Sequence, residues 1–477
     1  MADLPPELEK ELERLDREFW VSKGKLKRIV NRFIEELEEG LQKDGQNIPM
    51  NITWVLGLPS GNEKGKFLTL DLGGTNLRVC LVTLHGEDGK KEKHSLTQEQ
   101  YRLPNELKSG TAEELWNYVA DSLHQFIEGK DLGKEYTKDN PLPLGFTFSY
   151  PATQKAIAHG ILQTWTKGFD IKGVEGKDVA QQLRDAISAR NLPITLVALA
   201  NDTVGAMIAS AYNDPETIIG AIFGTGCNAA YMESISSIPK LKLEKEEWEV
   251  AREQKLQMAI NCEYGAFDNG RRVLPMTKYD EQIDEESPRP GEQTFEKLSA
   301  GLYLGEIFRL VLLDLHSENL VFKSQDIGKL RQSYAIDTGF LSQIEDDESP
   351  RFQRTRDLFK DTLGLVPSDP EIELSRRLAE LIAVRGARLC ACGVAAICTK
   401  DNITSGHVAA DGSVANKHPK FKRRWAKALG EILDLQRGEN PIQLTSAEDG
   451  SGVGVAVIAA MTLERKKKGN HIGIRGG

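Results

Sequence analysis

The feature that most constrains this chain is a strand–glycine turn–strand pattern that occurs twice. Apolar residues 67–70 and 77–84 flank a turn at 71–76 that contains Gly73 and Gly74. About 150 residues later, apolar residues 218–223 and 227–232 flank a turn at 224–226 that contains Gly224 and Gly226. Helical and strand patterns follow each copy. We therefore predict two related α/β halves, each presenting one glycine turn to a shared cleft.

Further elements follow from hydrophobic periodicity. Continuous apolar runs predict strands at 143–149, 194–200 and 407–410. Apolar residues at helical spacing predict helices at 26–41, 115–127, 204–212, 294–316, 371–400, 419–433 and 453–463. The polar end at 465–477 is expected to fray.

Size and charge narrow the class of protein. A chain of 477 residues exceeds the usual size of one core, so two or more lobes are expected. The net charge of −10 argues against a general partner for nucleic acid or anionic membrane. The N-terminus has no apolar signal core, and we expect no apolar run that spans a bilayer, so cytoplasm is the expected location.

The cysteines give no sign of a metal site. The six cysteines form no C-x-x-C pair, and no histidine cluster accompanies them. We interpret them as reduced thiols in a cytosolic protein rather than as zinc ligands.

Four glycine turns suggest phosphate binding. Phosphates favour close-approaching backbone N–H groups, and such turns contain Gly73–Gly74, Gly224–Gly226, Gly412 and Gly450–Gly452. The G-x-x-x-x-G-K-[ST] motif, a G-x-G-x-x-G after a strand and the protein-kinase catalytic triplet are all absent.

Asp202 lies where a buried strand meets a helix, and two interpretations remain open at this point. An aspartate there is a common helix N-cap. It is also suitably placed for a general base, because open α/β sheets bind ligands at the carboxyl ends of their strands.

Several segments together resemble hexokinases. They are residues 70–78, 144–151, 165–169, 201–205, 224–228, 261–267, 290–297 and 411–414, and they occur in family order between about residues 26 and 462. The residues at 166–170 and 262–264 are more similar to fungal hexokinases than to yeast glucokinase.

The resemblance implies an α/β actin-like ATPase fold, a duplicated ribonuclease-H-like arrangement with two lobes and a ligand cleft between them. It implies an N-terminal helical segment at 1–65, a small lobe at 66–200, a large lobe at 201–462 and a basic C-terminal tail at 463–477. The chain is one kinase unit, and either a monomer or a homodimer is expected.

The implied activity is transfer of the γ-phosphoryl group of ATP, with Mg²⁺, to the 6-hydroxyl of D-glucose, and also of fructose and mannose. The products are hexose 6-phosphate and ADP, as in the first step of glycolysis. A glucose-selective glucokinase and a non-catalytic glucose sensor remain alternatives, and an actin- or chaperone-type ATPase ranks last.

The resemblance also implies residue roles. Asp202 is the expected base, and Arg78 and Lys167 offset charge on the transferring group. Sugar hydroxyls are assigned to Ser149, Thr166, Lys167, Asn201, Asp202, Asn228, Glu263, Gln293 and Glu296. Phosphates are assigned to Gly73, Gly74, Thr75, Asn76, Gly224 and Thr225, while Asp71 orients Mg²⁺ through water. The nucleoside is bordered by Gly412, Ser413, Gly450, Ser451 and Gly452.

Overall fold

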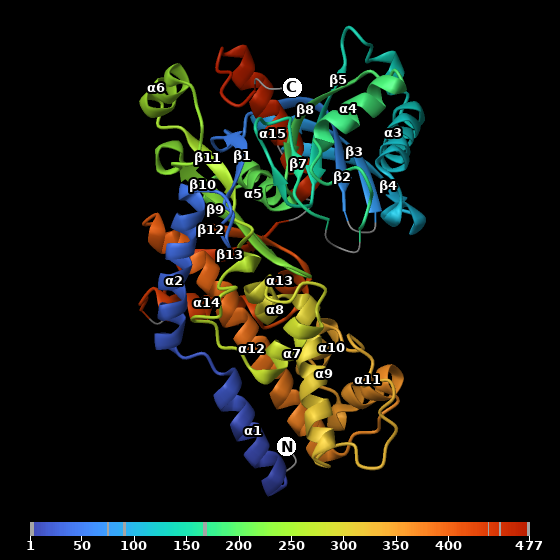
Figure 1. The fold of residues 1–477 in the computed structure, drawn as a ribbon, viewed down its shortest axis with the longest axis vertical. Helices are drawn as coiled ribbons and strands as arrows, with labels where there is room; N and C mark the ends of the chain where they lie inside the picture. The colour runs from blue at the N-terminus through green and yellow to red at the C-terminus, as the bar shows by residue number, and fades with distance from the viewer. Residues whose placement is uncertain are drawn as a thin grey trace.

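The computed structural model describes residues 4–73, 76–88, 92–165, 169–436, 438–447 and 450–474. Two mixed sheets lie side by side in the upper part of Figure 1, the smaller at the right and the larger at the left, and a helical region extends below them along the long axis.

The smaller sheet has the strand order β4-β3-β2-β5-β8. Its strands are β2 (Lys64–Leu72), β3 (Asn76–His85), β4 (His94–Arg102), β5 (Leu142–Phe148) and β8 (Ile194–Ala200). β2, β3 and β4 pair antiparallel, and β2, β5 and β8 pair parallel. Helices α3 (Ala112–Gly129) and α4 (Val179–Ala189) contact this sheet, as does α15 (Gly450–Lys467) from late in the chain.

The larger sheet repeats that arrangement. Its strands are β1 (Asn51–Leu56), β9 (Thr217–Phe223), β10 (Cys227–Ser234), β11 (Gln257–Asn261), β12 (Gly406–Asp411) and β13 (Ile442–Ser446), in the order β1-β11-β10-β9-β12-β13. From β11 to β13, two antiparallel pairings precede two parallel ones, as they do from β4 to β8. The predicted duplication of an α/β half is therefore confirmed, with β1 added at one edge.

A third apolar cluster lies among helices at the other end of the molecule (Figure 1). It involves α1 (Pro6–Phe19), α7 (Lys278–Glu286), α9 (Gly301–Ser317), α10 (Thr338–Glu345), α11 (Gln353–Leu363) and the first turns of α12 (Asp369–Lys400). The other elements are α2 (Lys23–Gln42), α5 (Asp202–Asn213), α6 (Lys245–Glu253), α8 (Thr294–Ser299), α13 (Ser413–Lys417), α14 (Phe421–Ile432), β6 (Ala152–Thr153) and β7 (Ile161–Leu162).

Helix α12 alone among the described helices has the length and apolar composition of a membrane span. Its most apolar 18-residue window is 89% buried within the fold, where α12 packs against α2 and α14. Such burial is typical of the core helix of a large domain.

All six cysteines are buried free thiols, which agrees with the reading of the sequence. Burial raises the pKa of Cys262 and of Cys392, so both thiols stay protonated and weakly nucleophilic at neutral pH.

Helices α5 and α15 cross where neither has a side chain. A Cβ atom on Gly454 would lie 2.0 Å from the carbonyl oxygen of Gly205, so only glycine permits this approach. The crossing thus joins α5, which follows β8 of the smaller sheet, to α15, which packs against that same sheet.

Two expectations were wrong. The predicted single helix at 294–316 is broken at Ala300, whose ψ is 153°, because the Gly301 N–H turns to donate to the Gly224 carbonyl at 2.7 Å. The end of the chain does not fray up to residue 474. Ile472 is buried, and the Gly473 carbonyl accepts from the Ile157 N–H at 2.8 Å.

Candidate active site

Asp202 is the first residue of α5, at the carboxyl end of β8. Asn201 is the N-cap, because its Oδ1 accepts from the Thr203 N–H at 2.8 Å. Asp202 Oδ1 accepts from the same N–H at 2.8 Å. Within the described part of the chain, nothing donates to Asp202 Oδ2. Asn201 thus supplies the cap, and one Asp202 oxygen is left for a ligand.

A chain of amides connects α5 to the ends of β10 and β11. Asn228 Nδ2 donates to Thr203 Oγ1 at 3.0 Å and to Asn261 Oδ1 at 2.8 Å. Asn261 Nδ2 donates to Glu263 Oε1 at 2.8 Å, and the Glu263 N–H donates to Asn228 Oδ1 at 2.9 Å. The network fixes the Glu263 carboxylate beside the N-terminus of α5.

Thr203 and Asn261 were not among the predicted site residues, although both lie inside the motifs that carried the resemblance. Each is buried and acts through a neighbour. Spacing alone does not distinguish such a supporting group from one that meets a ligand.

Glu296 and Gln293 approach the same place from α8. Glu296 Oε2 accepts from the Cys227 N–H at 2.9 Å. A Cβ on Gly226 would lie 2.7 Å from that oxygen, and a Cβ on Gly265 would lie 2.4 Å from Gln293 Oε1. The two glycines therefore make room for the two side chains.

Backbone strain gathers in this region. Glu263 and Gln293 both have φ of 55°, a left-handed conformation that costs free energy in residues other than glycine. Such strain persists only where the surrounding structure imposes it.

The smaller sheet contributes a second acidic group. Asp71, the penultimate residue of β2, is almost fully buried, and Arg78 Nη2 donates to its Oδ2 at 2.6 Å. The Tyr150 hydroxyl donates to the Gly73 carbonyl at 3.2 Å. Burial raises the pKa of Tyr150, and the charges of Asp71 and Asp202 raise it further. The hydroxyl therefore lies in the field of both carboxylates.

Two of the glycine turns meet at the carboxyl end of the larger sheet. The Gly224 N–H donates to the Gly226 carbonyl at 3.0 Å. Gly412 has φ of 110°, and a Cβ there would lie 2.7 Å from the Gly224 nitrogen. Thr225 and Ser413 are exposed beside these turns. The arrangement brings backbone groups from β9 and β12 to one edge.

The remaining predicted residues are placed as follows. Ser149 follows β5 half-buried, and Asn76 opens β3. A Cβ on Gly450 would lie 2.8 Å from Ala206 Cα, so this glycine serves close packing of α15 on α5, and Gly452 lies near Thr69 and Cys80. Gly74, Thr75, Thr166, Lys167 and the side chain of Ser451 lie outside the described residues.

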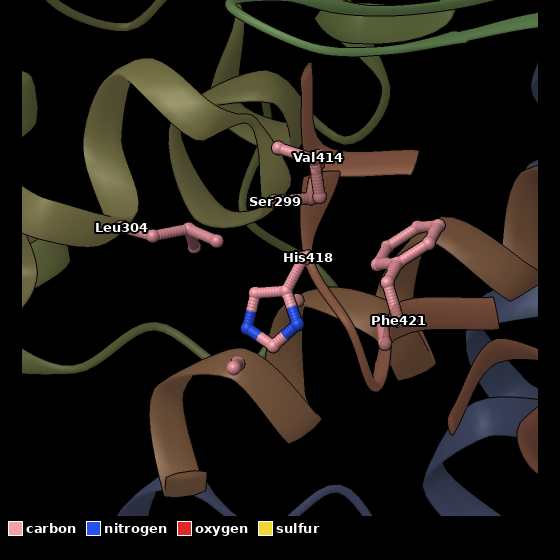
Figure 2. Close-up of a pocket in the computed structure, with 8 residues that line it drawn as sticks. Ser299, Leu304, Val414, His418 and Phe421 are labelled. Carbon is pink, nitrogen blue, oxygen red and sulfur yellow. The ribbon is translucent and has the colours of Figure 1, made fainter. Parts of the chain in front are cut away.

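A small cavity lies behind the Gly412 turn (Figure 2). Its lining is mainly apolar and includes Leu304, Val414 and Phe421, with His418 the main polar group. It holds about one water molecule. It is thus too small for a nucleoside.

Comparisons with known proteins agree with this geometry. Two family models, both described as hexokinase, match residues 11–212 and 218–461. A hexokinase of Emericella nidulans is 54% identical, over 100% of this chain and 95% of that protein. Hexokinase-1 of Saccharomyces cerevisiae is 50% identical, over 100% of this chain and 97% of that protein.

The solved structures give the fold. A hexokinase from Schistosoma mansoni complexed with glucose has a TM-score of 0.83 at 33% identity, covering 95% of this chain and 99% of that one. The fold is thus the α/β actin-like ATPase fold in two lobes, as predicted. With matching family models over both halves and close relatives over its whole length, the chain belongs to the hexokinase family and is a hexose kinase.

Proposed function

We propose that this hexose kinase transfers the γ-phosphoryl group of ATP to the 6-hydroxyl of glucose, fructose and mannose, with Asp202 as the general base. The observation that carries the proposal is the free Oδ2 of Asp202 at the carboxyl end of β8, beside the fixed Glu263 carboxylate. A base must reach the proton it accepts, and an oxygen of the half-exposed Asp202 to which no described residue donates meets that requirement. In phosphoryl transfer, an aspartate that accepts the hydroxyl proton is sufficient as base.

The sugar is held by carboxylates and amides. Each sugar hydroxyl is both donor and acceptor; the carboxylates of Glu263 and Glu296 accept, and the amides of Asn201 and Gln293 can donate. Both N–H groups of Asn228 already donate to Thr203 and Asn261, so its direct contact with the sugar stays a prediction. A site built in this way rejects analogues that lack a hydroxyl, because its own polar groups would be left unpaired. Ser149, Asn201 and Gln293 complete the proposed shell from the described residues, and Thr166 and Lys167 stay predictions.

We assign the binding of the ATP triphosphate to the glycine turns. We assign Gly73, Asn76, Gly224 and Thr225 to phosphate contacts and the Gly412–Ser413 edge to the nucleoside. Backbone N–H groups at such turns bind anionic oxygens. Arg78 already pairs with Asp71, so its first role is to hold that carboxylate in position.

The donor set fits Mg²⁺. Asp71 offers a hard oxygen ligand, and the effect of both Asp71 and Asp202 on Tyr150 indicates a locally negative field that favours a divalent cation. When bound, the ion neutralises charge that develops on the phosphates. Asp71 would orient it through water.

The decisive variant is Asp202→Asn. Loss of the base should lower turnover at least about 100-fold, while the dissociation constant for glucose changes only a few-fold. Asp185→Asn, which alters an exposed aspartate of α4, is the matched control and should behave as the wild type. Unchanged turnover in Asp202→Asn would contradict the proposed base.

A coupled assay across glucose, fructose, mannose and galactose tests the substrate range. Activity confined to glucose would favour a glucokinase. Glucose binding without turnover in the wild-type chain would favour a sensor.

Hexose binding should also close the two lobes and exclude water from the transferring group. Small-angle scattering should show compaction with glucose, and an unchanged radius of gyration would refute closure. The boundaries at 65, 200 and 462, the monomer or homodimer state and the cytoplasmic location stay predictions.

A further inference from the structure

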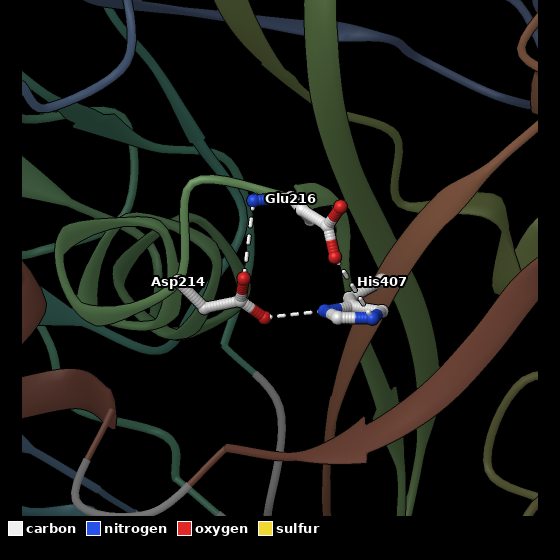
Figure 3. Close-up of side chains that lie close together, drawn as sticks. All are labelled: Asp214, Glu216 and His407. Atoms are coloured by element: carbon white, nitrogen blue, oxygen red, sulfur yellow. Dashed lines mark hydrogen bonds and ion pairs between the residues drawn. The ribbon is translucent and has the colours of Figure 1, made fainter.

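Three side chains that offer metal ligands lie close together at the starts of strands β9 and β12 (Figure 3), at the opposite end of these strands from the glycine turns. Asp214 follows the last residue of α5, Glu216 directly precedes β9, and His407 is the second residue of β12. β9 and β12 run parallel, and their other ends carry Gly224 and Gly412. This cluster is therefore separate from the candidate active site by the length of the strands.

The two ring nitrogens of His407 contact different carboxylates. Nδ1 lies 2.5 Å from Asp214 Oδ2, so it donates a hydrogen bond to that carboxylate. Nε2 is then the ring nitrogen that remains to bind a metal ion. It lies 3.5 Å from Glu216 Oε2, which is longer than an ordinary hydrogen bond. Two ligands of one tetrahedral Zn²⁺ lie about 3.3 Å apart, so this gap is close to the one a zinc ion needs.

The contact with Asp214 has the form that metal-binding histidines use. Such a histidine usually donates its second ring N–H to a carboxylate, which fixes the tautomer and the direction of the ring. Among the described residues, neither carboxylate pairs with a lysine or an arginine, so neither of those side chains competes with an ion for them.

The backbone holds the cluster in place. The Glu216 N–H donates to Asp214 Oδ1 at 3.1 Å, and the His407 N–H donates to the Glu216 carbonyl at 2.8 Å. Gly406 has φ of 138°, and a Cβ there would lie 2.9 Å from the same carbonyl, so glycine permits this approach. A preformed arrangement of this kind loses little entropy when an ion binds.

Thr217 supplies an independent observation. Its side chain is 1% exposed, and its Oγ1 has no hydrogen-bond partner in the described structure. Thr217 and His407 are partners in the parallel ladder, next to a register shift between His407 and Val408. A buried hydroxyl without a partner is costly, and a water molecule on a bound ion would supply one.

We propose that His407 Nε2 and Glu216 Oε2 bind a Zn²⁺ ion, with Asp214 as the positioning residue and water completing the coordination. The site joins the end of α5 to the starts of β9 and β12. Its expected effect is on stability, because binding to the folded chain alone raises the free energy of unfolding.

Equilibrium dialysis of the metal-free full chain against ZnCl₂, without nucleotide, tests the proposal. The wild type should bind Zn²⁺ at a site that His407→Ala and Glu216→Gln both lose. Asp214→Asn should retain the site with affinity weakened by at least about tenfold. The same ranking should appear in the rise of Tm with Zn²⁺.

The matched control is His124→Ala. It removes the histidine of an exposed pair on α3, in which Nε2 lies 3.3 Å from Glu128 Oε1 without a third ligand. This variant should bind as the wild type does.

Equal binding by the wild type and Glu216→Gln, or no saturable binding by the wild type up to millimolar Zn²⁺, would overturn the proposal. Glu216 is suited to this role because its side chain is 71% exposed, so the amide is expected to fold even if His407→Ala does not. Hexose phosphorylation by Glu216→Gln without Zn²⁺ should equal that of the wild type.

Discussion

Replacing Gly226 with alanine tests the assignment of Glu296 to the sugar site. The new Cβ would lie 2.7 Å from Glu296 Oε2, whereas ordinary contacts begin at 3.4 Å. The oxygen must therefore retreat by about 0.7 Å, the difference between those two distances. Gly226 is not among the positive-φ glycines, so alanine suits its backbone conformation and the contact is the main cost.

Displacement of Oε2 weakens the hydrogen bond that holds the Glu296 carboxylate. Its bond from the Cys227 N–H is 2.9 Å long, and a further 0.7 Å takes it past the range of a hydrogen bond. Hydrogen bonds to a charged group contribute about 1.5–3 kcal/mol. The KM for glucose should accordingly rise at least about tenfold. Because Glu296 is assigned to contact the sugar equally before and during phosphoryl transfer, its displacement should change kcat little.

The assay measures KM for glucose and for ATP separately, with glucose affinity by calorimetry and Tm by scanning fluorimetry. Gly24→Ala is the control, since its Cβ would meet nothing within 4 Å. Unchanged glucose affinity, or a rise confined to the KM for ATP, would refute the placement of Glu296 at the sugar.

Two further predictions concern stability. Gly454→Ala forces a Cβ to 2.0 Å from the Gly205 carbonyl oxygen, and overpacking of this kind costs about 1–3 kcal/mol, so for a chain of this length Tm should fall by about 1–3 degrees relative to Gly24→Ala. An equal Tm for the two alanine variants would contradict the close crossing. Burial alone would raise the pKa of Glu345, but hydrogen bonds from Arg424 and the nearby His418 ring lower it from 4.5 to about 2. The charged form therefore adds stability that is fully present above pH 4.5 and is lost as the pH falls toward 2. The difference in Tm between wild type and Glu345→Gln should be largest near pH 7 and narrow below pH 4.5, and a constant difference would contradict this coupling.

The sequence predicted the strands that flank the two glycine turns, together with β5, β8 and β12, and missed β1, β4, β11 and β13. β8 and β9 occur within one residue of the predicted ranges, because a buried strand is a short apolar run with clear ends. The break between α8 and α9 was missed, since it depends on a bond from Gly301 to the distant Gly224 carbonyl. Local hydrophobic periodicity cannot reveal a hydrogen-bond partner that is distant in the sequence.

For the site, too, one part could be predicted from the sequence and another could not. Side chains within motifs, such as Asp202 and Asn228, were identified individually, and the structure brings them together through Thr203. The Asp214–His407 contact could not be foreseen, because the two residues are 193 positions apart and meet only through sheet register.

The bare crossing of Gly205 and Gly454 has a mechanical consequence. At the crossing point itself the two helices touch backbone to backbone, so no side chain there has to disengage when one helix turns over the other. Rotation about that point costs little packing, while the flanking residues still limit translation. The contact is therefore suited to act as the pivot for the lobe closure that we propose on hexose binding.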